Sequence, residues 1–585
     1  MSCNNVVYSI NGPVVTVKGK TDLGMMEMVY VGYQRLVGEV IGVDSDKTTI
    51  QVYEDTVGLK PGEPVESTGS QLCVTLGPGI LSNIFDGIER PLKTLEKQSG
   101  AFIGKGFNAC VLDEERLWDV TVTVKVGDEI EGGSVYAECP ETSAIMHKVM
   151  LSPLLRGTVT SVKPNGKYKV NDIIAEITDK SGKVTGLTLC QKWPIRIPRP
   201  VCERLSADRP LITGQRVIDT LFPVAKGGSA AVPGGFGTGK TMTQHQIAKW
   251  CDADIIVYVG CGERGNEMTQ ALTEFSELID PRSGRPLTDR TVLIANTSNM
   301  PVAAREASIY TGITLAEYYR DMGYHTAIMA DSTSRWAEAL REISGRLEEM
   351  PADEGFPAYL PSRLSAFYER AGYMKTLCDE EGSVTIIGAV SPQGSDFSEP
   401  VTQNTKRFTR CFWALDKSLA YARHYPAVNW DNSYSEYSAE LEQWYEENVA
   451  PDFNVCRNEI ASILYKETGL MEIVKLIGAD VLPDDQKLTL EIARVIREGF
   501  LQQNAFHKYD TYVPVIKQYK MMKAILHLYH KCQHIIALQV PVSRLVATGL
   551  FEKLIKIKYD VSNEDMKALD SYITVIDETL SSYII

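Results

Sequence analysis

Short runs of β-branched residues separated by turn residues characterise the first 75 positions of the chain. The runs cover residues 14–17, 37–43 and 49–52, and the turn signals that bound or separate them are Gly12-Pro13, Asp44–Asp46 and Pro61-Gly62. β-Branched residues favour strands, whereas Gly and Pro favour the turns between strands. Because an open sheet would leave edge strands unpaired, the pattern predicts a small closed β-barrel over residues 1–75.

A second β-rich stretch covers residues 112–190. Polar and apolar residues alternate strictly over 119–126, which predicts a half-buried strand through this range. Gly127-Asp128 and Gly132-Gly133 then predict hairpin turns. We interpret 112–190 as an inserted all-β module and 76–111 as the linker and start of the domain that the module interrupts.

From 191 to 435 strand-like and helix-like patterns alternate. Apolar β-type runs occur at 230–232, 255–259, 292–295, 327–330 and 384–390, and residues 303–320 have helical spacing. This alternation predicts a mainly parallel sheet with helices on both faces. Beyond 435 the apolar positions follow helical spacing only, as at Leu488, Ile492, Val495 and Phe500, so residues 436–585 are predicted to form a helical domain.

Composition narrows the function classes. The chain has 585 residues, which predicts several domains, and a net charge of −15, whereas proteins that follow nucleic acid backbones usually carry a basic surplus. No run of 18 apolar residues occurs, so no transmembrane helix is predicted. The twelve cysteines contain no Cys-x-x-Cys pair, which argues against the common zinc ribbons and redox dithiols. We therefore expect a cytoplasmic protein that binds no nucleic acid.

Residues 234–241 match the phosphate-binding pattern G-x-x-x-x-G-K-[ST]. The residues are Gly234, Gly235, Phe236, Gly237, Thr238, Gly239, Lys240 and Thr241. Glycines let backbone N–H groups turn toward phosphate oxygens, and the helix that follows adds its positive end. A strand-like run precedes the loop and a helix-like stretch over 242–250 follows it, so we expect Lys240 to bind the β and γ phosphates and Thr241 to bind Mg²⁺.

Two further carboxylates follow apolar strand patterns. Asp331 ends the run 325–331, which is the Walker B pattern for a magnesium ligand. Glu263 comes after the run 255–259, where ligands of open α/β sheets bind, and a carboxylate there can polarise an attacking water. From spacing alone, a second interpretation is equally good: Glu263 and Arg264 could form an exposed ion pair in a surface turn.

Several longer motifs carry a specific resemblance. They are GCGERGNEM at 260–268, SNMPVAAR at 298–305, DSTSRW at 331–336, VSPQGSDFSEPVTQN at 390–404 and Gln503-Asn504-Ala505-Phe506. Together with the phosphate loop, they resemble the catalytic A subunit (alpha chain) of V/A-type rotary ATPases and ATP synthases, over essentially the whole chain. The implied fold is multidomain α/β: an N-terminal β-barrel, an inserted all-β module, a RecA-like P-loop nucleotide-binding domain and a C-terminal helical bundle.

The resemblance also implies residue roles. Glu263 would be the catalytic carboxylate, with Arg264 holding the phosphates and orienting it. Asp331 and Glu267 would contact Mg²⁺ through water, and Tyr425 and Phe506 would sandwich the adenine of ATP or ADP. Thr238 replaces the cysteine that eukaryotic vacuolar relatives carry before Gly-Lys-Thr, which favours a bacterial or archaeal complex.

The implied assembly is an A₃B₃ hexamer with a homologous non-catalytic B subunit that supplies an arginine finger in trans. Central and peripheral stalks and a membrane sector that moves H⁺ or Na⁺ would complete it, with this chain peripheral to the membrane. Three alternatives stay open: a non-catalytic nucleotide-binding subunit, a hexameric nucleic acid translocase and a protein-export ATPase. The acidic balance disfavours the translocase, and the inserted module disfavours the export ATPase.

Overall fold

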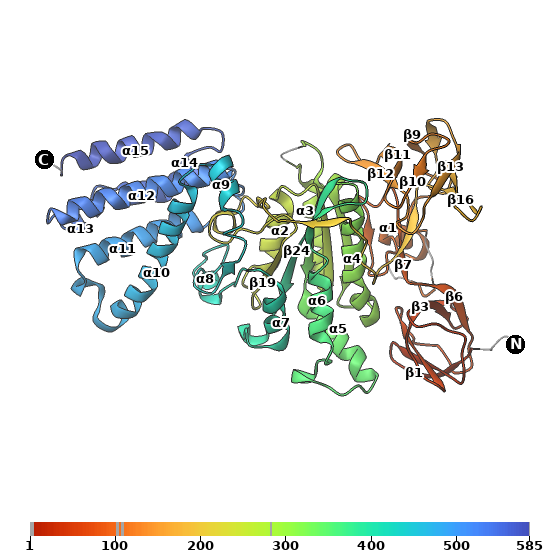
Figure 1. Cartoon of the computed structure of the whole chain (residues 1–585). Helices are drawn as coiled ribbons and strands as arrows, with labels where there is room; N and C mark the ends of the chain where they lie inside the picture. Colours follow the sequence, from red (N-terminus) through yellow and green to blue (C-terminus); the bar gives the residue numbers. More distant parts are fainter. Residues whose placement is uncertain (1–4, 101–103, 107–109, 281–282, 584–585) are drawn as a thin grey trace. The chain divides into compact units, whose positions relative to one another are not determined.

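The computed structural model describes residues 5–100, 104–106, 110–280 and 283–583. The chain forms two compact units (Figure 1). Unit 1 comprises Met1–Ser206, Ala253–Ser391 and Phe397–Phe408, and unit 2 comprises Ala207–Asp252, Pro392–Asp396 and Thr409–Ile585. The predicted ranges 1–75, 76–111, 191–435 and 436–585 each include a few positions that lie outside the described residues.

The N-terminal part of unit 1 is a six-stranded antiparallel barrel. Its strands lie in the order β1-β2-β5-β4-β3-β6. Their bounds are β1 Val7–Asn11, β2 Val14–Lys18, β3 Glu27–Val31, β4 Leu36–Val43, β5 Lys47–Val52 and β6 Val65–Gln71. An antiparallel bridge between Val6 and Pro64 joins the two outer strands, and the alternate inward residues Val15, Val29 and Ile50 are fully buried. The predicted barrel is confirmed.

The inserted module of unit 1 consists of two four-stranded sheets. One contains β9 Trp118–Val122, β11 Val135–Pro140, β12 Met146–Met150 and β14 Gly166–Tyr168; the other contains β10 Glu129–Ile130, β13 Gly157–Val162, β15 Ala175–Thr178 and β16 Val184–Leu187. The prediction of a strand over 119–126 is wrong beyond Val122. The Asp128 carboxylate accepts a 2.8 Å hydrogen bond from the Lys125 N–H, and Gly127 (φ +98°) turns the chain.

A parallel sheet forms the centre of unit 1 (Figure 1). Its order is β24-β22-β20-β21-β8, with β23 antiparallel at β24 and β18 antiparallel at β23, and β7 pairs with β17 in a separate two-stranded sheet. The bounds are β7 Cys73–Leu76, β8 Ile84–Phe85, β17 Gln191–Pro194, β18 Glu203–Leu205, β20 Ile255–Glu263, β21 Thr291–Thr297, β22 His325–Asp331, β23 Gly372–Lys375 and β24 Glu381–Val390. The helices are α1 Leu92–Ser99, α3 Gly265–Glu277, α4 Val302–Asp321, α5 Thr333–Arg346, α6 Leu360–Tyr368 and α7 Pro400–Phe408.

Unit 2 combines a short three-stranded segment with a helical bundle. β19 Ser229–Pro233 is parallel to β25 Cys411–Phe412, which is antiparallel to β26 Tyr434–Ser435. The helices are α2 Lys240–Trp250, α8 Lys417–Tyr421, α9 Glu442–Asn448, α10 Phe453–Ile477, α11 Asp484–Val495, α12 Val515–Ala537, α13 Val542–Val546, α14 Leu550–Asp560 and α15 Met566–Ser581, with π-helical turns η1 Val217–Leu221 and η6 Ile496–Leu501. In the bundle α12 packs against α10, α11 and α15, and α14 packs against η6. The predicted fold class is confirmed.

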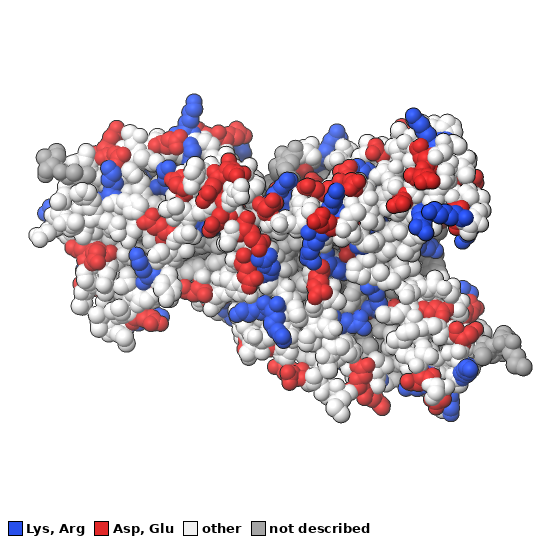
Figure 2. Space-filling view, in the orientation of Figure 1, with Lys and Arg blue, Asp and Glu red and all other residues white. Residues whose placement is uncertain are grey.

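Surface and helix composition complete the description. None of the helices in the described ranges combines the length and apolar character needed to cross a bilayer. Figure 2 shows that acidic and basic side chains are interspersed over the visible face, within an overall charge of −15.

Candidate nucleotide site

The phosphate loop in unit 2 has the backbone that an anion site requires. It follows β19, whose five residues are all buried, and it ends where α2 begins at Lys240. Gly237 (φ +80°) and Gly239 (φ +84°) adopt the left-handed conformation, which residues with a Cβ rarely adopt. The N–H groups of the first turn of α2 lack helical partners and carry the positive end of the helix dipole. The loop can therefore surround a phosphate with N–H groups.

Close packing beneath the loop explains two more of its glycines. A Cβ on Gly235 would lie 2.1 Å from Ser395 Oγ, and a Cβ on Gly234 would lie 2.9 Å from Leu415 Cβ. The buried Thr238 hydroxyl donates to the Gly235 carbonyl at 2.8 Å and braces the turn. The Phe236 side chain is 84% exposed, so among the predicted loop residues it belongs to the outer surface of the loop.

A pocket of about 490 Å³ adjoins the end of this loop within unit 2. Tyr425 and Phe506 both line it, and a Cβ on Gly239 would lie 3.3 Å from Tyr425 Cε1. The remaining lining residues are Gln215, Gly239, Met242, Thr243, Gln246, Arg423, Pro426, Gln502, Gln503, Asn504, Ala505 and Tyr559. Two exposed aromatic rings, at 42% for Tyr425 and 90% for Phe506, thus flank a largely apolar pocket next to the phosphate loop.

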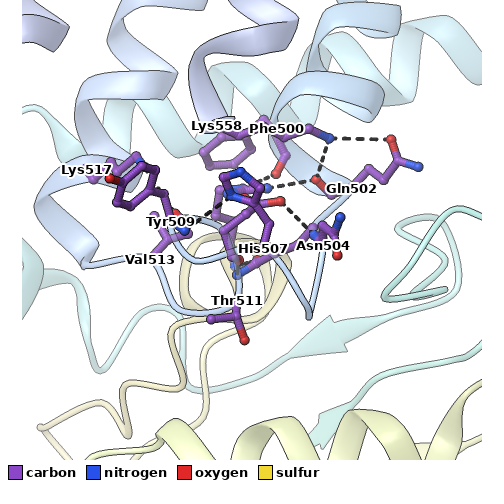
Figure 3. A network of polar contacts seen from close by, with 12 residues as sticks. Phe500, Gln502, Asn504, His507, Tyr509, Thr511, Val513, Lys517 and Lys558 are labelled. Carbon is purple, nitrogen blue, oxygen red and sulfur yellow. Dashed lines mark hydrogen bonds and ion pairs between the residues drawn. The ribbon is translucent and has the colours of Figure 1, made fainter. Parts of the chain in front are cut away.

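Residues 502–506 form one wall of this pocket and are held by a dense polar network (Figure 3). The Gln503 N–H donates to the Tyr425 carbonyl at 2.7 Å, and the Gln503 amide donates to the carbonyls of Gly214 and Asp510. The Phe506 N–H donates to the Asn504 side-chain oxygen at 2.9 Å. Our sequence reasoning named Phe506 but missed the role of Gln502, Gln503 and Asn504, although the motif around Phe506 contained the last two.

In unit 1, the predicted acidic residues lie at the carboxyl ends of neighbouring parallel strands. Glu263 is the last residue of β20 and is half-buried, and Asp331 is the last residue of β22 and is fully buried. The register pairs Gly260 with Asp331, so both carboxylates belong to the same sheet edge. Arg264 is the exposed N-cap of α3, and Glu267 lies in the first turn of α3, where an acidic residue also favours the helix dipole.

The surroundings of Asp331 are suited to a cation. Its Oδ2 accepts a 3.1 Å hydrogen bond from the Tyr258 hydroxyl, whereas Oδ1 is buried without a hydrogen-bond partner. Burial raises the pKa of Tyr258 well above its usual value, and the negative charges of Asp331, Glu263 and Glu267 raise it further. The three carboxylates therefore all act on the Tyr258 hydroxyl beside Asp331, and a site with this negative charge fits a metal ion or its bound water. Within the described ranges, no group of three His, Cys, Asp or Glu side chains is arranged as a metal site.

Glycine also shapes the end of β20. Gly262 (φ +75°) approaches α5 so closely that a Cβ would lie 2.8 Å from Arg335 Cβ. The Ser332 N–H donates to the Cys261 carbonyl at 3.3 Å, which ties this strand end to the start of α5. The Glu263 backbone is consequently fixed by tight packing on its N-terminal side.

Four family profiles match successive segments of the chain. Residues 7–69 match the β-barrel domain of the ATP synthase alpha/beta family, and residues 109–196 match the barrel-sandwich domain of its subunits. Residues 214–435 match the nucleotide-binding domain of the same family, and residues 442–543 match the C-terminal domain of V and A type ATP synthases.

Similar proteins match over the full length. The chain is 59% identical over 577 residues to V-type ATP synthase alpha chain 2 of Clostridium tetani, covering 99% of this chain and 97% of that protein. It is 60% identical to the V-type ATP synthase alpha chain of Halothermothrix orenii, covering 98% and 97%. It is 54% identical to the A subunit of the A-type ATP synthase of Methanopyrus kandleri, covering 100% and 99%. The chain belongs to the A-subunit (alpha-chain) family of V/A-type ATP synthases.

Family membership confirms the predicted class of enzyme, an ATPase/ATP synthase subunit that couples ATP turnover to ion transport, and nucleotide binding with it. It also makes the chain a component of a V/A-type ATP synthase complex, and the alternative functions are not favoured. The assembled ATPase EscN of the enteropathogenic E. coli type III secretion system is 20% identical, with a TM-score of 0.62 over 89% of this chain and 99% of EscN, which shows a shared fold.

Proposed function

We propose that this A-subunit homologue binds Mg·ATP on the loop 234–241 and places the adenine between Tyr425 and Phe506. The observation that carries the proposal is the continuity of the loop with the adjoining pocket of about 490 Å³ inside one unit. A glycine loop at a helix N-terminus suits phosphates, and a largely apolar pocket with two aromatic rings suits a nucleobase.

In this proposal, separate polar and charged residues bind the phosphates and the Mg²⁺ ion. Lys240, the first residue of α2, would neutralise the β and γ phosphates together with the loop N–H groups. Thr241 would contact Mg²⁺ through its hydroxyl, and Asp331 and Glu267 would hold the water around the ion. When bound, Mg²⁺ lowers the negative charge of the phosphates and so eases attack at the terminal phosphorus. The buried oxygen of Asp331 without a partner supports this assignment.

Glu263 is proposed as the catalytic carboxylate that orients and polarises the attacking water, with Arg264 holding the phosphates. The position of Glu263 at the end of β20, beside the strand that ends in Asp331, supports this role. In the assembly we propose an A₃B₃ head peripheral to a membrane, in which the B subunit supplies an arginine in trans. Stalk subunits would couple ATP turnover in this head to ion transport in a membrane ion-translocating sector.

Glu263→Gln in the assembled complex tests the catalytic assignment. Glutamine keeps the size of the side chain but cannot accept a proton, so we expect kcat to fall by about 10²–10⁴-fold. ATP binding should stay within a few-fold of wild type, measured with a fluorescent nucleotide. Glu277→Gln, at an exposed position in the last turn of α3, is the matched control and should change neither kcat nor ATP binding. A kcat for Glu263→Gln within tenfold of wild type would sink the assignment.

A further inference from the structure

The pocket wall 502–506 begins at the end of the π-helical turn η6. The last carbonyls of a helix have no helical partner and form its negative end, so they need donors from elsewhere. In this chain the donors to the carbonyls of Glu498, Phe500 and Gln502 are buried cationic side chains. Hydrogen bonds from buried cationic side chains therefore hold the start of the wall in place.

Arg216 is the first of these cations and is fully buried. Its guanidinium donates to the Phe500 carbonyl, to the Gln502 carbonyl at 2.7 Å and to the Asp510 carboxylate at 2.5 Å. Its own backbone N–H donates to the Gln503 side-chain oxygen at 2.9 Å. The other Asp510 oxygen accepts from the Asn504 N–H at 2.6 Å. Arg216 thus contacts the wall directly and also through Asp510.

Lys558, from helix α14, is the second cation and is 2% exposed. Its ammonium donates to the Glu498 carbonyl at 2.6 Å and to the Gln502 carbonyl at 3.1 Å, and Figure 3 shows it beside Gln502. Tyr559, the next residue of α14, lines the pocket itself. One turn of α14 consequently lines the pocket through Tyr559 and contacts the wall 502–506 through Lys558.

The cluster buries more positive than negative charge. Among the described residues, Arg216, Lys558 and the neighbouring Lys517 all lie near one buried carboxylate, Asp510, and Lys558 also lies near the partly exposed carboxylate of Glu498. Burial, with repulsion from Arg216, lowers the pKa of Lys558 to about 8. Replacing buried charges with apolar groups often stabilises a protein, so stability alone does not account for this arrangement. What the cations do instead is donate hydrogen bonds: Arg216 and Lys558 both bind backbone carbonyls at the start of the wall 502–506.

We propose that Lys558 and Arg216 are positioning residues for nucleobase recognition, which fix the wall 502–506 against the bound base. The inference rests on the proposed base pocket and goes beyond it, because neither residue lines the pocket. Through Lys558, a displacement of α14 would move the Gln502 carbonyl and with it the wall. Affinity for the base then depends on the position of a helix in the C-terminal bundle.

Lys558→Met in the assembled complex tests the proposal. Methionine keeps the aliphatic volume but donates no hydrogen bond, so we expect the KM for ATP to rise about tenfold, the equivalent of about 1.4 kcal/mol. The kcat at saturating ATP should stay within twofold. The Ki of inorganic tripolyphosphate, a competitor without a base, should not change. Lys556→Met, an exposed lysine on the same helix, is the matched control and should change neither constant.

The conservative variant Lys558→Gln keeps an N–H donor and should recover part of the ATP affinity, and it carries the test if the methionine variant does not assemble. Equal losses of ATP and tripolyphosphate affinity would overturn the inference, because they would indicate general damage to the phosphate loop. An unchanged KM for ATP would overturn it as well. Failure of tripolyphosphate to compete with ATP in the wild-type complex would instead count against the proposed phosphate site.

Discussion

At the scale of single residues, Asp331 has the least satisfied environment of the predicted site residues. One of its oxygens bonds to Tyr258, and the other is buried without a hydrogen-bond partner. A buried carboxylate oxygen that lacks a partner costs free energy, and a bound ion or water at this position would satisfy it. This atom supports the Mg²⁺ assignment independently of the family resemblance.

Asp331→Asn tests this assignment. The amide oxygen can still accept from Tyr258, so the fold should be kept, while the loss of charge should raise the Mg²⁺ concentration for half-maximal ATPase activity by about 10–100-fold. Activity is measured against Mg²⁺ at fixed ATP. Tyr258→Phe keeps the charge of Asp331 but removes its hydrogen bond, so it should raise the Mg²⁺ requirement less than Asp331→Asn does. An unaltered requirement in Asp331→Asn would contradict the role.

Residue types at fixed spacing predicted the phosphate loop, but they did not predict which residues elsewhere in the chain complete the nucleotide site. Gly234 to Thr241 lie within eight consecutive positions, so their geometry is local. Glu263 remained ambiguous from spacing, because a strand end and a surface turn have the same local sequence. The residues that hold the base pocket, Arg216 and Lys558, have no motif of their own and were missed.

At the scale of elements, helix α12 contributes a buried lysine to the same cluster. Lys517 donates to the Val561 carbonyl at 2.7 Å, just after α14, and to the Asn563 side chain at 3.0 Å. Burial, reinforced by repulsion from Arg216, lowers the pKa of Lys517 from 10.5 to about 8. The charged form is therefore disfavoured in the folded chain relative to the unfolded chain.

This shift predicts a pH dependence of stability. Between pH 8 and 10.5 the unfolded chain binds more protons at this lysine, so the contribution of Lys517 to stability rises with pH in that window. Relative to Lys517→Met, the wild type should gain about 2–3 kcal/mol as pH rises through the window, because a difference of one in pKa corresponds to about 1.4 kcal/mol. Thermal unfolding at about pH 7.5, 8.5 and 9.5 measures this, with exposed Lys553→Met as control. A difference that is constant with pH would refute the prediction.

At the scale of the whole molecule, a buried cluster of hydrogen bonds around Glu141 joins the inserted module to the parallel-sheet domain of unit 1. The Glu141 carboxylate accepts from the Gly79 and Leu81 N–H groups, pairs with His147 at 2.8 Å and accepts from Tyr319 of α4. The other nitrogen of His147 bonds to Tyr318 at 2.9 Å. Burial acts to raise the pKa of Glu141, but His147 and the backbone N–H groups outweigh it and lower the pKa below its usual value.

Glu141→Ala should therefore loosen the module. The substitution leaves two backbone donors, Tyr319 and His147 without their acceptor, so we expect a loss of about 3–5 kcal/mol and faster proteolysis within 112–190. Glu138 lies on β11, which ends one residue before Glu141, and makes no ion pair among the described residues, so Glu138→Ala should change little. Because the folded pKa of Glu141 is depressed, the wild-type advantage should be full above about pH 4.5 and shrink as pH falls below it. Equal proteolysis rates for Glu141→Ala and Glu138→Ala would contradict the proposed role of Glu141 in holding the module.

Local patterns in the sequence determined the kinds of element and the phosphate loop. Periods of two and of 3.6 residues reflect which faces are buried, and a phosphate loop needs only neighbouring residues. The tertiary structure decided what meets across long separations: Tyr425 with Phe506 at one pocket, and Arg216 with Asp510 through an ion pair. Such encounters depend on chain topology and on how buried polar groups find partners, and neither leaves a periodic signal in the sequence.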